Sequence, residues 1–384
     1  METTVDLEQG ILWRGDWKRL QKAMRKARRG EEITVGFLGG SLTQGSRASC
    51  AETCYAYLVY EWWKKNFPES RVRYHNAGIG GTTSQFGAAR AEADLLRFQP
   101  DVVVVEFSVN DENTLLFRET YEGLIRKILK WPGEPAVFLL CNVFYDTGDS
   151  AQDQHSLIGR HYDLPCLSMK ESLYPKVADG TIPAESITTD YLHPNDEGHA
   201  WLARQVCYFL EKVYRDKEPS EQPLIPPDPA PPGIPEPLPR PLTPNTYECC
   251  ARYQNTNSFP ACDGFFPDGR KQRAITEIFR NGWSAAETGA SIRFEVEGSG
   301  LALQYRKSVK KPACLAQAVI DGNSKEAVLL DGNFTEDWGD CLYLETVLFH
   351  GERKPHTVEI TVTWAEEGAV PFYLVSVIVS EAAR

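Results

Sequence analysis

A stretch of prolines just past the middle of the chain constrains the fold more than any other feature. Residues 218–244 read EPSEQPLIPPDPAPPGIPEPLPRPLTP, in which proline recurs too often for a helix or a strand to persist. Such a composition favours an extended polyproline II linker. Because the 384 residues also exceed what one hydrophobic core usually supports, we predict two domains, residues 1–217 and 245–384, joined by this linker.

Before the linker, short apolar runs alternate with segments whose apolar residues recur at helical spacing. The runs are typical of strands buried on both faces, and they read ITVGFL, VRYHNA, DVVVVEF, AVFLLCNV and LPCLSM. Between them lie ETCYAYLVYEWWKKNF, SQFGAARAEADLLRF and YEGLIRKILKW. This alternation predicts an α/β domain with a parallel sheet and helices on both faces. Ligands of such sheets bind at the carboxyl ends of the strands.

After the linker, the period of the pattern changes from helical to alternating. Seven stretches alternate apolar and polar residues: ASIRFEVEG, GLALQYR, AQAVIDGN, EAVLLDGN, CLYLETVLF, HTVEITVTW and YLVSVIVS. Asp-Gly and Gly-Asn turns between them are typical of antiparallel hairpins. We therefore predict that residues 245–384 form an all-β sandwich, similar to a jelly roll.

The net charge of the chain limits the classes of molecule that it is expected to bind. The net charge of −12 argues against binding to nucleic acid or to an anionic membrane surface, because like charges repel. The first residues, METTVDLEQG, lack the apolar core of a secretory signal. No run of about 18 apolar residues is present either. We therefore expect a cytoplasmic protein that acts on a small or neutral substrate.

The cysteines and histidines do not form a metal-binding pattern. Ten cysteines and seven histidines are present, but neither paired C-x-x-C motifs nor an H-E-x-x-H helix occurs. We expect the cysteines to be buried, reduced thiols. No metal and no cofactor are expected.

Ser41 is the first candidate for chemistry. It stands in GFLGGSLTQGSR, residues 36–47, directly after the first predicted strand. A serine becomes nucleophilic when a neutral imidazole takes its proton and a carboxylate fixes that imidazole. The segment DYLH supplies such a pair as Asp190 and His193, and Asn195 is placed to cap the helix that follows.

Two further polar or glycine-rich segments follow the next two strands. Residues 78–81 come after the second strand and Asn110 after the third, so both should share one rim of the sheet with Ser41. We expect His199 and His75 to be structural or surface residues.

Residues 39–45 also invite comparison with other phosphate-binding and nucleophile motifs. The segment lacks the lysine of a Walker loop, the spacing of a dinucleotide-binding loop and the glycine at position 43 of an α/β-hydrolase elbow. A flavodoxin-like cradle for the phosphate of FMN stays open, because SLTQGS offers hydroxyls and backbone amides. A purely structural turn also stays open.

Four segments in this order resemble the motif blocks of the SGNH or GDSL hydrolases, over about residues 31–213. The resemblance implies a flavodoxin-like parallel sheet and a serine hydrolase. It implies a nucleophile from GGSLTQG, oxyanion donors from that turn, NAGIGGTTS and FSVND, and a base with its carboxylate from DYLH. Carried over, the roles fall on Ser41 as nucleophile and oxyanion donor, Gly81 and Asn110 as oxyanion donors, His193 as base and Asp190 as its partner.

One position departs from the family's signature. Gly40 stands where the literal G-D-S-L motif has an aspartate. Since that aspartate is neither the nucleophile nor its base, the departure questions membership of the lipase-like branch more than it questions catalysis.

The order of the domains resembles that of bacterial carbohydrate acetylesterases. It is similar to carbohydrate esterase family 17, the mannan-oligosaccharide acetylesterases, whose second domain resembles a family 35 carbohydrate-binding module. This resemblance implies removal of O-acetyl groups from acetylated manno-oligosaccharides. Another acyl hydrolase, such as a xylan acetylesterase, lysophospholipase or thioesterase, stays open, as does a sugar-binding or flavin-binding module without activity.

Trp283 is the candidate for sugar binding in the second domain. It lies in RNGWSA, where the small and polar neighbours favour an exposed loop, and an indole ring can stack on the apolar face of a sugar. We expect it to help hold the oligosaccharide. The alternative is a second domain that serves as a scaffold or as the surface of a homodimer.

Overall fold

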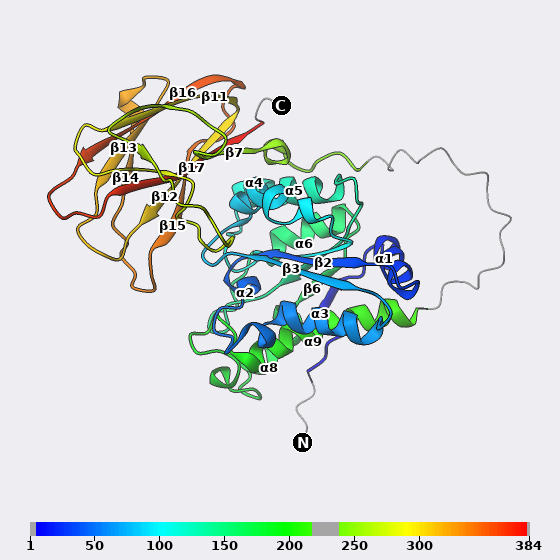
Figure 1. Ribbon diagram of the computed structural model, residues 1–384. Helices are drawn as coiled ribbons and strands as arrows, with labels where there is room; N and C mark the ends of the chain where they lie inside the picture. The colour runs from blue at the N-terminus through cyan, green and yellow to red at the C-terminus, as the bar shows by residue number, and fades with distance from the viewer. Residues whose placement is uncertain (1–4, 217–237, 382–384) are drawn as a thin grey trace, which may run out of the picture. The chain divides into compact units, whose positions relative to one another are not determined.

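The structure, a computed structural model, describes residues 5–216 and 238–381 (Figure 1). Most of the predicted linker, residues 218–237, lies outside the described residues. The described chain forms two compact units that meet in sequence between Asn245 and Thr246. The first unit holds the predicted α/β domain, and the second holds the predicted β domain.

The α/β domain is built on one six-stranded sheet. In spatial order its strands are β1 (Ile11–Trp13), β6 (Cys166–Ser168), β5 (Ala136–Cys141), β4 (Val102–Glu106), β2 (Ile33–Gly39) and β3 (Val72–Gly78). The strands β2 to β6 are parallel and fall on the five predicted runs. Numbered along the chain from β2, they have the order 2-1-3-4-5 of a flavodoxin-like sheet. The predicted fold class is confirmed.

The edge strand β1 was missed in the sequence. It pairs antiparallel with β6, opposite Leu167 and Cys166. Three residues are too few to display an alternating pattern, and β1 is only partly buried. An antiparallel strand at the edge of a parallel sheet is common in folds of this class.

Helices cover both faces of this sheet (Figure 1). Their bounds are α1 (Lys18–Arg28), α2 (Ser41–Gln44), α3 (Tyr55–Asn66), α4 (Ser84–Asp94), α5 (Leu115–Leu129), α6 (Gln152–His161), α7 (Met169–Ser172), α8 (Tyr174–Ala178) and α9 (Asp196–Arg215). The helices α4, α5 and α6 lie on one face, and α1, α3 and α9 pack against the other. None of the helices within the described ranges is both long and apolar enough to cross a bilayer.

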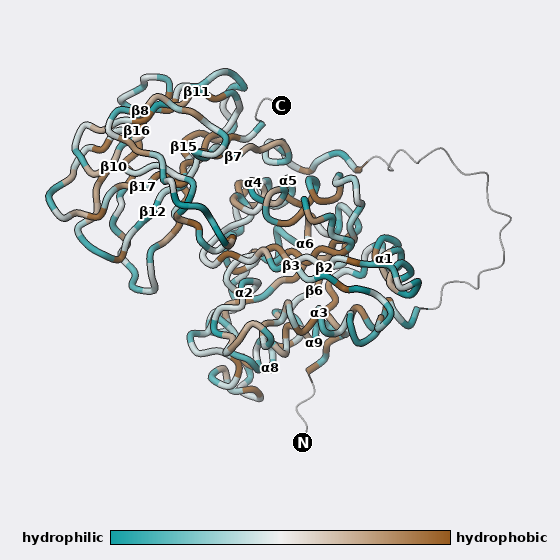
Figure 2. Tube along the Cα trace, in the orientation of Figure 1, coloured by the Kyte–Doolittle hydropathy of each residue, from teal (hydrophilic) through white to brown (hydrophobic). Residues whose placement is uncertain are grey.

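The central strands are apolar throughout because both of their faces are covered. Every residue of β2, β4 and β5 is buried. Figure 2 shows β2 largely in brown, the hydrophobic end of the scale, while α1 is largely teal. On one face, Phe37 and Phe138 share a core with Phe209 of α9. This helix begins after Asn195, whose side chain accepts a hydrogen bond from Gly198 N–H, as predicted for its cap.

The β domain consists of two antiparallel sheets. One contains β15 (Cys341–Leu348), β12 (Gly300–Lys307), β17 (Phe372–Ser380), β10 (Trp283–Ala285) and β9 (Phe266–Pro267), with β7 (Ala251–Tyr253) also paired to β17. The other contains β14 (Val328–Asp331), β13 (Leu315–Ile320), β16 (Lys354–Trp364), β11 (Ser291–Gly298) and β8 (Ala261–Asp263). All seven predicted strands are present. In β11, buried residues alternate with exposed ones, and side chains from both sheets meet in one core.

Trp283 is the first correction to the sequence analysis. It lies in strand β10 opposite Leu374, and only 2% of its surface is exposed. Its ring meets Phe294 of the other sheet edge-to-face, with centroids 5.3 Å apart. The predicted exposed loop is therefore wrong, because the small flanking residues belong to a short strand rather than to a solvent-facing turn. A buried indole has no free face for a sugar ring.

The described end of the proline-rich segment is bound to the α/β domain. The Glu122 carboxylate of α5 accepts hydrogen bonds from the backbone N–H groups of Leu242 and Thr243, at 2.7 and 2.8 Å. On the same helix, Arg126 Nη1 donates to Pro239 O at 2.7 Å. Because Glu122 is fully buried, this attachment is part of the domain's structure.

Candidate active site

The turn after β2 places Ser41 at the carboxyl end of the sheet. Ser41 is the first residue of α2 and is nearly buried, with 5% of its surface exposed. The turn is tight, since a Cβ on Gly39 would lie 2.2 Å from Thr43 Oγ1 and 2.5 Å from Glu106 O. Only glycine fits between these atoms. The helix α2 ends at Gly45, whose φ of 96° lies in the left-handed region.

Ser41, His193 and Asp190 form one chain of hydrogen bonds. Ser41 Oγ lies 3.0 Å from His193 Nε2, and His193 Nδ1 lies 2.8 Å from Asp190 Oδ2. With Nδ1–H donating to the carboxylate, Nε2 is free to accept the serine proton. The structure thus brings together three residues that are up to 152 positions apart in the sequence.

The loop DYLH holds this geometry from several sides. Asp190 Oδ1 accepts the backbone N–H groups of His193 and Leu192, at 2.7 and 3.1 Å. Thr188 Oγ1 donates to His193 O at 2.8 Å, and Tyr145 N–H donates to Tyr191 O at 2.7 Å. Burial raises the pKa of the Asp190 carboxyl, but the hydrogen bonds from His193 and Leu192 outweigh it and hold the pKa below its ordinary value.

The glycine turn after β3 lies beside the serine. A Cβ on Gly80 would lie 3.6 Å from Ser41 Cβ. Gly80 N–H donates to Gln44 Oε1 at 2.5 Å, whereas Gly81 has a left-handed φ of 66°. In the part of the chain that the structure describes, neither Ser41 N–H nor Gly81 N–H donates a hydrogen bond. Both amides are therefore available to an oxyanion.

Asn110 follows β4 and completes this rim. Its N–H and that of Asp111 both donate to Phe107 O, at 3.0 and 2.9 Å, which makes a tight turn. The side-chain oxygen of Asn110 packs against Gly40, because a Cβ there would lie 2.1 Å from Asn110 Oδ1. Asn110 therefore packs against the residue that precedes Ser41. The side chains of Ser41 and Asn110 thus belong to one site.

A buried hydrogen bond between a histidine and a carboxylate anchors the turn that carries Asn110. Asp111 Oδ2 lies 3.0 Å from His155 Nε2, and Asp111 Oδ1 accepts Ser84 N–H at 2.8 Å. Both side chains of the pair are fully buried, and Tyr121 stacks on the His155 ring at 3.6 Å. The sequence offered no signal for this pair, since its members are 44 residues apart.

Two further side chains at the site were not foreseen. Gln44 fixes the glycine turn through Gly80, as given above. Arg47 lies at the exposed edge, with Nε 3.8 Å from Asp190 Oδ2, and its backbone has a left-handed φ of 67°. Such a φ is uncommon for a residue with a side chain. No sequence pattern distinguishes either residue from an ordinary surface residue.

The other histidines singled out in the sequence lie outside the hydrogen-bonded chain. His199 is buried in α9, where Nδ1 accepts Tyr55 N–H at 3.4 Å and Nε2 lies 3.2 Å from Ser46 O. Burial lowers the pKa of His199 to about 4. His75 stacks on Phe98, with centroids 4.1 Å apart. Both have the structural surroundings that the sequence analysis expected.

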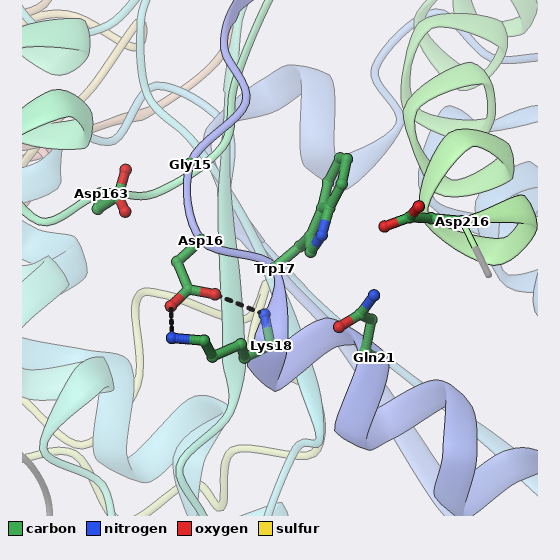
Figure 3. Close-up of a pocket in the computed structure, with 7 residues that line it drawn as sticks. All are labelled: Gly15, Asp16, Trp17, Lys18, Gln21, Asp163 and Asp216. Atoms are coloured by element: carbon green, nitrogen blue, oxygen red, sulfur yellow. Dashed lines mark hydrogen bonds and ion pairs between the residues drawn. The ribbon is translucent and has the colours of Figure 1, made fainter. Parts of the chain in front are cut away.

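The pocket drawn in Figure 3 contains none of the predicted site residues. It lies where α1 begins, and its lining residues are Gly15, Asp16, Trp17, Lys18, Gln21, Asp163 and Asp216. Asp16 is paired within the pocket to Lys18 Nζ at 3.1 Å. Across residues 5–216 and 238–381, no group of three or more His, Cys, Asp or Glu side chains is placed to hold a metal ion.

Comparison with a protein family agrees with the site's position. A model of the GDSL-like lipase/acylhydrolase family matches residues 37–201. The matched span runs from the strand before Ser41 to the helix after His193.

Comparison with solved structures extends over both domains. The chain is 51% identical to a two-domain esterase active on acetylated mannans and co-crystallised with mannopentaose, covering 99% of this chain and 100% of that chain with a TM-score of 0.92. A further structure of a two-domain esterase active on acetylated mannans is 52% identical, covers 98% of this chain and 99% of that chain, and has a TM-score of 0.92.

More distant relatives match less than half of the chain. The thioesterase 1/protease 1/lysophospholipase L1 of Escherichia coli (strain K12) is 28% identical over 185 residues, which are 45% of this chain and 83% of that protein. An acetylxylan esterase of Geobacillus stearothermophilus is 25% identical over 206 residues, 46% of this chain and 92% of that protein. Similarity over the whole length is thus found with the two-domain esterase.

Proposed function

Because this chain belongs to the GDSL-like lipase/acylhydrolase family, we propose that it is a serine esterase that removes O-acetyl groups from acetylated manno-oligosaccharides. The observation that carries the chemistry is the hydrogen-bonded chain from Ser41 through His193 to Asp190. The similarity over 99% of the chain to an esterase active on acetylated mannans supports the substrate. Removal of an acetyl group leaves the free sugar hydroxyl and acetate.

The first half of the reaction forms an acetyl-enzyme. Ser41 Oγ attacks the ester carbonyl carbon while His193 Nε2 accepts the hydroxyl proton. Asp190 Oδ2, at 2.8 Å from His193 Nδ1, stabilises the imidazolium that results. When the tetrahedral intermediate collapses, the bond to the sugar oxygen breaks and His193 returns the proton to that oxygen. The sugar then leaves with its hydroxyl restored.

The second half regenerates the serine. Water takes the place of the sugar, gives a proton to His193 Nε2 and attacks the acetyl carbon. Collapse of the second tetrahedral intermediate breaks the bond to Ser41 Oγ, which recovers the proton from His193. Acetic acid is released and ionises in water.

Three donors would stabilise the oxyanion in both halves. The N–H groups of Ser41 and Gly81 make no hydrogen bond within the described residues, and Asn110 contributes its side-chain amide. Fixed donors of this kind are typically worth about 3 kcal/mol each in transition-state stabilisation, because they need no reorganisation during the reaction.

The β domain would act as a carbohydrate-binding module, with Trp338 in place of Trp283 as the aromatic contact. More than half of the Trp338 surface, 55%, is exposed. Its ring packs edge-to-face on Phe334 at 5.0 Å, and Nε1–H donates to Glu336 Oε2 at 2.5 Å. An exposed indole that is held by its neighbours binds a sugar face without a large loss of side-chain entropy.

The test is a comparison of substrates by mass spectrometry. Purified enzyme and its Ser41→Ala variant are incubated with acetylated manno-oligosaccharides, acetylated xylo-oligosaccharides, a fatty acyl thioester and a lysophospholipid. We expect fast deacetylation of the manno-oligosaccharides by the wild type and a loss of about three to six powers of ten in the variant. Faster turnover of xylo-oligosaccharides would change the proposed sugar, and faster turnover of either lipid substrate would replace the proposal by a lipid acyl hydrolase.

A further inference from the structure

The position that departs from the G-D-S-L signature has a distinct place in the structure. Gly40 lies between the end of β2 and Ser41. Its N–H donates to Glu106 O of β4 at 3.2 Å, and its carbonyl oxygen accepts Gln44 N–H at 3.0 Å. The backbone of Gly40 is therefore fixed between the sheet and the helix α2, so that a side chain added there could not move aside.

The space next to the Gly40 Cα is filled by the side chain of Asn110. A Cβ on Gly40 would lie 2.1 Å from Asn110 Oδ1 and 3.0 Å from Asn110 Cγ, while the next atom, Thr82 O, would be at 3.5 Å. The first distance is far below van der Waals contact, whereas the last is ordinary. A side chain at position 40 and the observed conformation of Asn110 therefore exclude each other, whichever atom of the amide lies there.

Within the described residues, no hydrogen bond holds the Oδ1 end of the Asn110 amide at this place. Asn110 Oδ1 is buried and has no hydrogen-bond partner among the described residues. Buried polar atoms without a partner are rare in folded proteins, and they are often found where a function requires the geometry. Close packing against Gly40 thus contributes to where the amide lies.

We propose that Gly40 is a positioning residue for the oxyanion hole: by lacking a side chain, it lets the Asn110 amide lie beside Ser41 and present Nδ2 to the oxyanion. The proposal rests on the proposed function, in which Asn110 is an oxyanion donor.

The kinetic consequence is specific to the transition state. Gly40→Ala would push the amide away from the serine without touching the hydrogen bonds between Ser41, His193 and Asp190. Loss of one oxyanion donor lowers kcat by about 10²–10³-fold and leaves KM nearly unchanged, because the donor acts after charge develops on the carbonyl oxygen. Binding of a boronic acid, which forms a tetrahedral adduct with an active serine, should weaken in parallel.

The experiment is a double-mutant cycle with an aryl acetate as substrate. Gly40→Ala, Asn110→Ala and the double variant are compared for kcat, KM and inhibition by phenylboronic acid. We expect each single variant to lose about 10²-fold or more in kcat and the double variant to lose no more than Asn110→Ala, since the clash is then gone. A kcat within threefold of wild type for Gly40→Ala, or multiplicative losses in the double variant, would overturn the proposal.

Two controls separate this result from trivial causes. Gly133→Ala makes the same chemical change where the nearest atom is 3.4 Å away, and wild-type kinetics are expected. A crystal structure of Gly40→Ala should show a displaced Asn110 amide whatever the substrate, so it tests the steric claim even if the proposed activity fails. An amide that has not moved contradicts the proposal. If Gly40→Ala does not fold, the double variant should fold, and its failure to do so would also contradict the proposal.

Discussion

Asp190 holds His193 at two points with its two carboxylate oxygens. Oδ1 accepts the backbone N–H of His193 at 2.7 Å, and Oδ2 bonds the ring Nδ1 at 2.8 Å. The carboxylate therefore fixes both the position of the residue and the tautomer of its ring. The two tasks can be separated by mutation, because an amide has one oxygen and one nitrogen.

The Asp190→Asn variant is expected to keep the conformation of the DYLH loop but to lose most of its esterase activity. The amide oxygen can still accept the His193 N–H, whereas the amide nitrogen would donate to Nδ1 and leave the proton on Nε2, where it blocks uptake of the Ser41 proton. We expect kcat for an aryl acetate to fall by about 10⁴-fold. The melting temperature should stay close to that of the wild type. A loss below tenfold would contradict the role of Asp190.

The dependence of activity on pH should show one ionisation on its acid side. The pKa of the Asp190 carboxyl lies below its ordinary value, so this group stays charged in the range where an imidazole titrates. A base must be unprotonated to act, and therefore kcat/KM should rise with pH on the acid side of the profile. The measurement is a pH profile of aryl acetate hydrolysis, and a profile that is flat on its acid side would argue against His193 as the base.

A buried carboxyl beneath the nucleophile turn should make stability depend on pH. Burial raises the pKa of Glu106 from 4.5 to about 7. The folded protein then keeps this proton up to about pH 7, while the unfolded chain releases it near 4.5, so the free energy of unfolding falls as pH rises between these values. The difference amounts to about 3 kcal/mol above pH 7. Protonation of Glu106 thus favours the folded state only on the acid side.

Glu106→Gln should remove this dependence. The amide oxygen can still accept the hydrogen bonds that Ser108 donates to Glu106 Oε1, both at 3.1 Å, and no charge is buried. We expect the melting temperature of the variant to exceed that of the wild type at pH 8 and to approach it at pH 5. Glu112→Gln, at an exposed position, is the matched control. An equal difference at both pH values would rule out titration of Glu106.

Trp283→Ala should unfold the β domain rather than change substrate binding. The ring is 2% exposed and packs in the core between the two sheets. Truncation of a buried aromatic side chain typically costs about 3–5 kcal/mol, through lost burial and the cavity left behind. The check is denaturant unfolding of the purified variant, and a change below 1 kcal/mol would contradict the observed burial.

Trp338→Ala should affect oligosaccharides but not small esters. Because Trp338 is largely exposed, its loss should leave stability nearly unchanged and raise KM for acetylated manno-oligosaccharides by about tenfold, the effect of losing one stacking contact of 1–2 kcal/mol. Hydrolysis of an aryl acetate should stay at the wild-type rate. Trp364→Ala, at a 37% exposed tryptophan of the same domain, is the control. Unchanged kinetics on both substrates would remove Trp338 from the sugar contact.

Most of the fold was predictable because its strands show regular patterns of apolar residues. The strands β2 and β4 are covered on both faces, and continuous runs such as DVVVVEF carry that information locally. The turn at Asp321 and Gly322, both with a left-handed φ, was foreseen from its Asp-Gly pair, although the connection from β13 to β14 is longer than a tight hairpin turn. By contrast, β1 and β10 span three residues each, too few to show a period. Trp283 was misplaced for this reason.

The predicted site residues came from motifs in which each short segment carries its own chemistry. Ser41 and Asp190 each lie within hydrogen-bond distance of His193. The roles of the three residues in catalysis stay predictions. The contacts that set the geometry of the site could not be predicted from the sequence, because they join segments that are far apart along the chain. The approach of Asn110 to Gly40 and the pairing of Asp111 with His155 depend on how β4 lies beside β2 and α6. Only the folded chain contains that information.

The attachment of Leu242 and Thr243 to Glu122 changes where the covalent junction between the domains lies. The chain leaves α9 at Arg215 and is bound to the same domain again by Pro239, so residues 217–237 connect two points of one domain. Insertions or deletions there would change the number of residues between Arg215 and Pro239 without changing the Asn245–Thr246 passage into the β domain. A single protease cut within residues 217–237 would likewise leave the β domain attached to the α/β domain through the segment bound to Glu122.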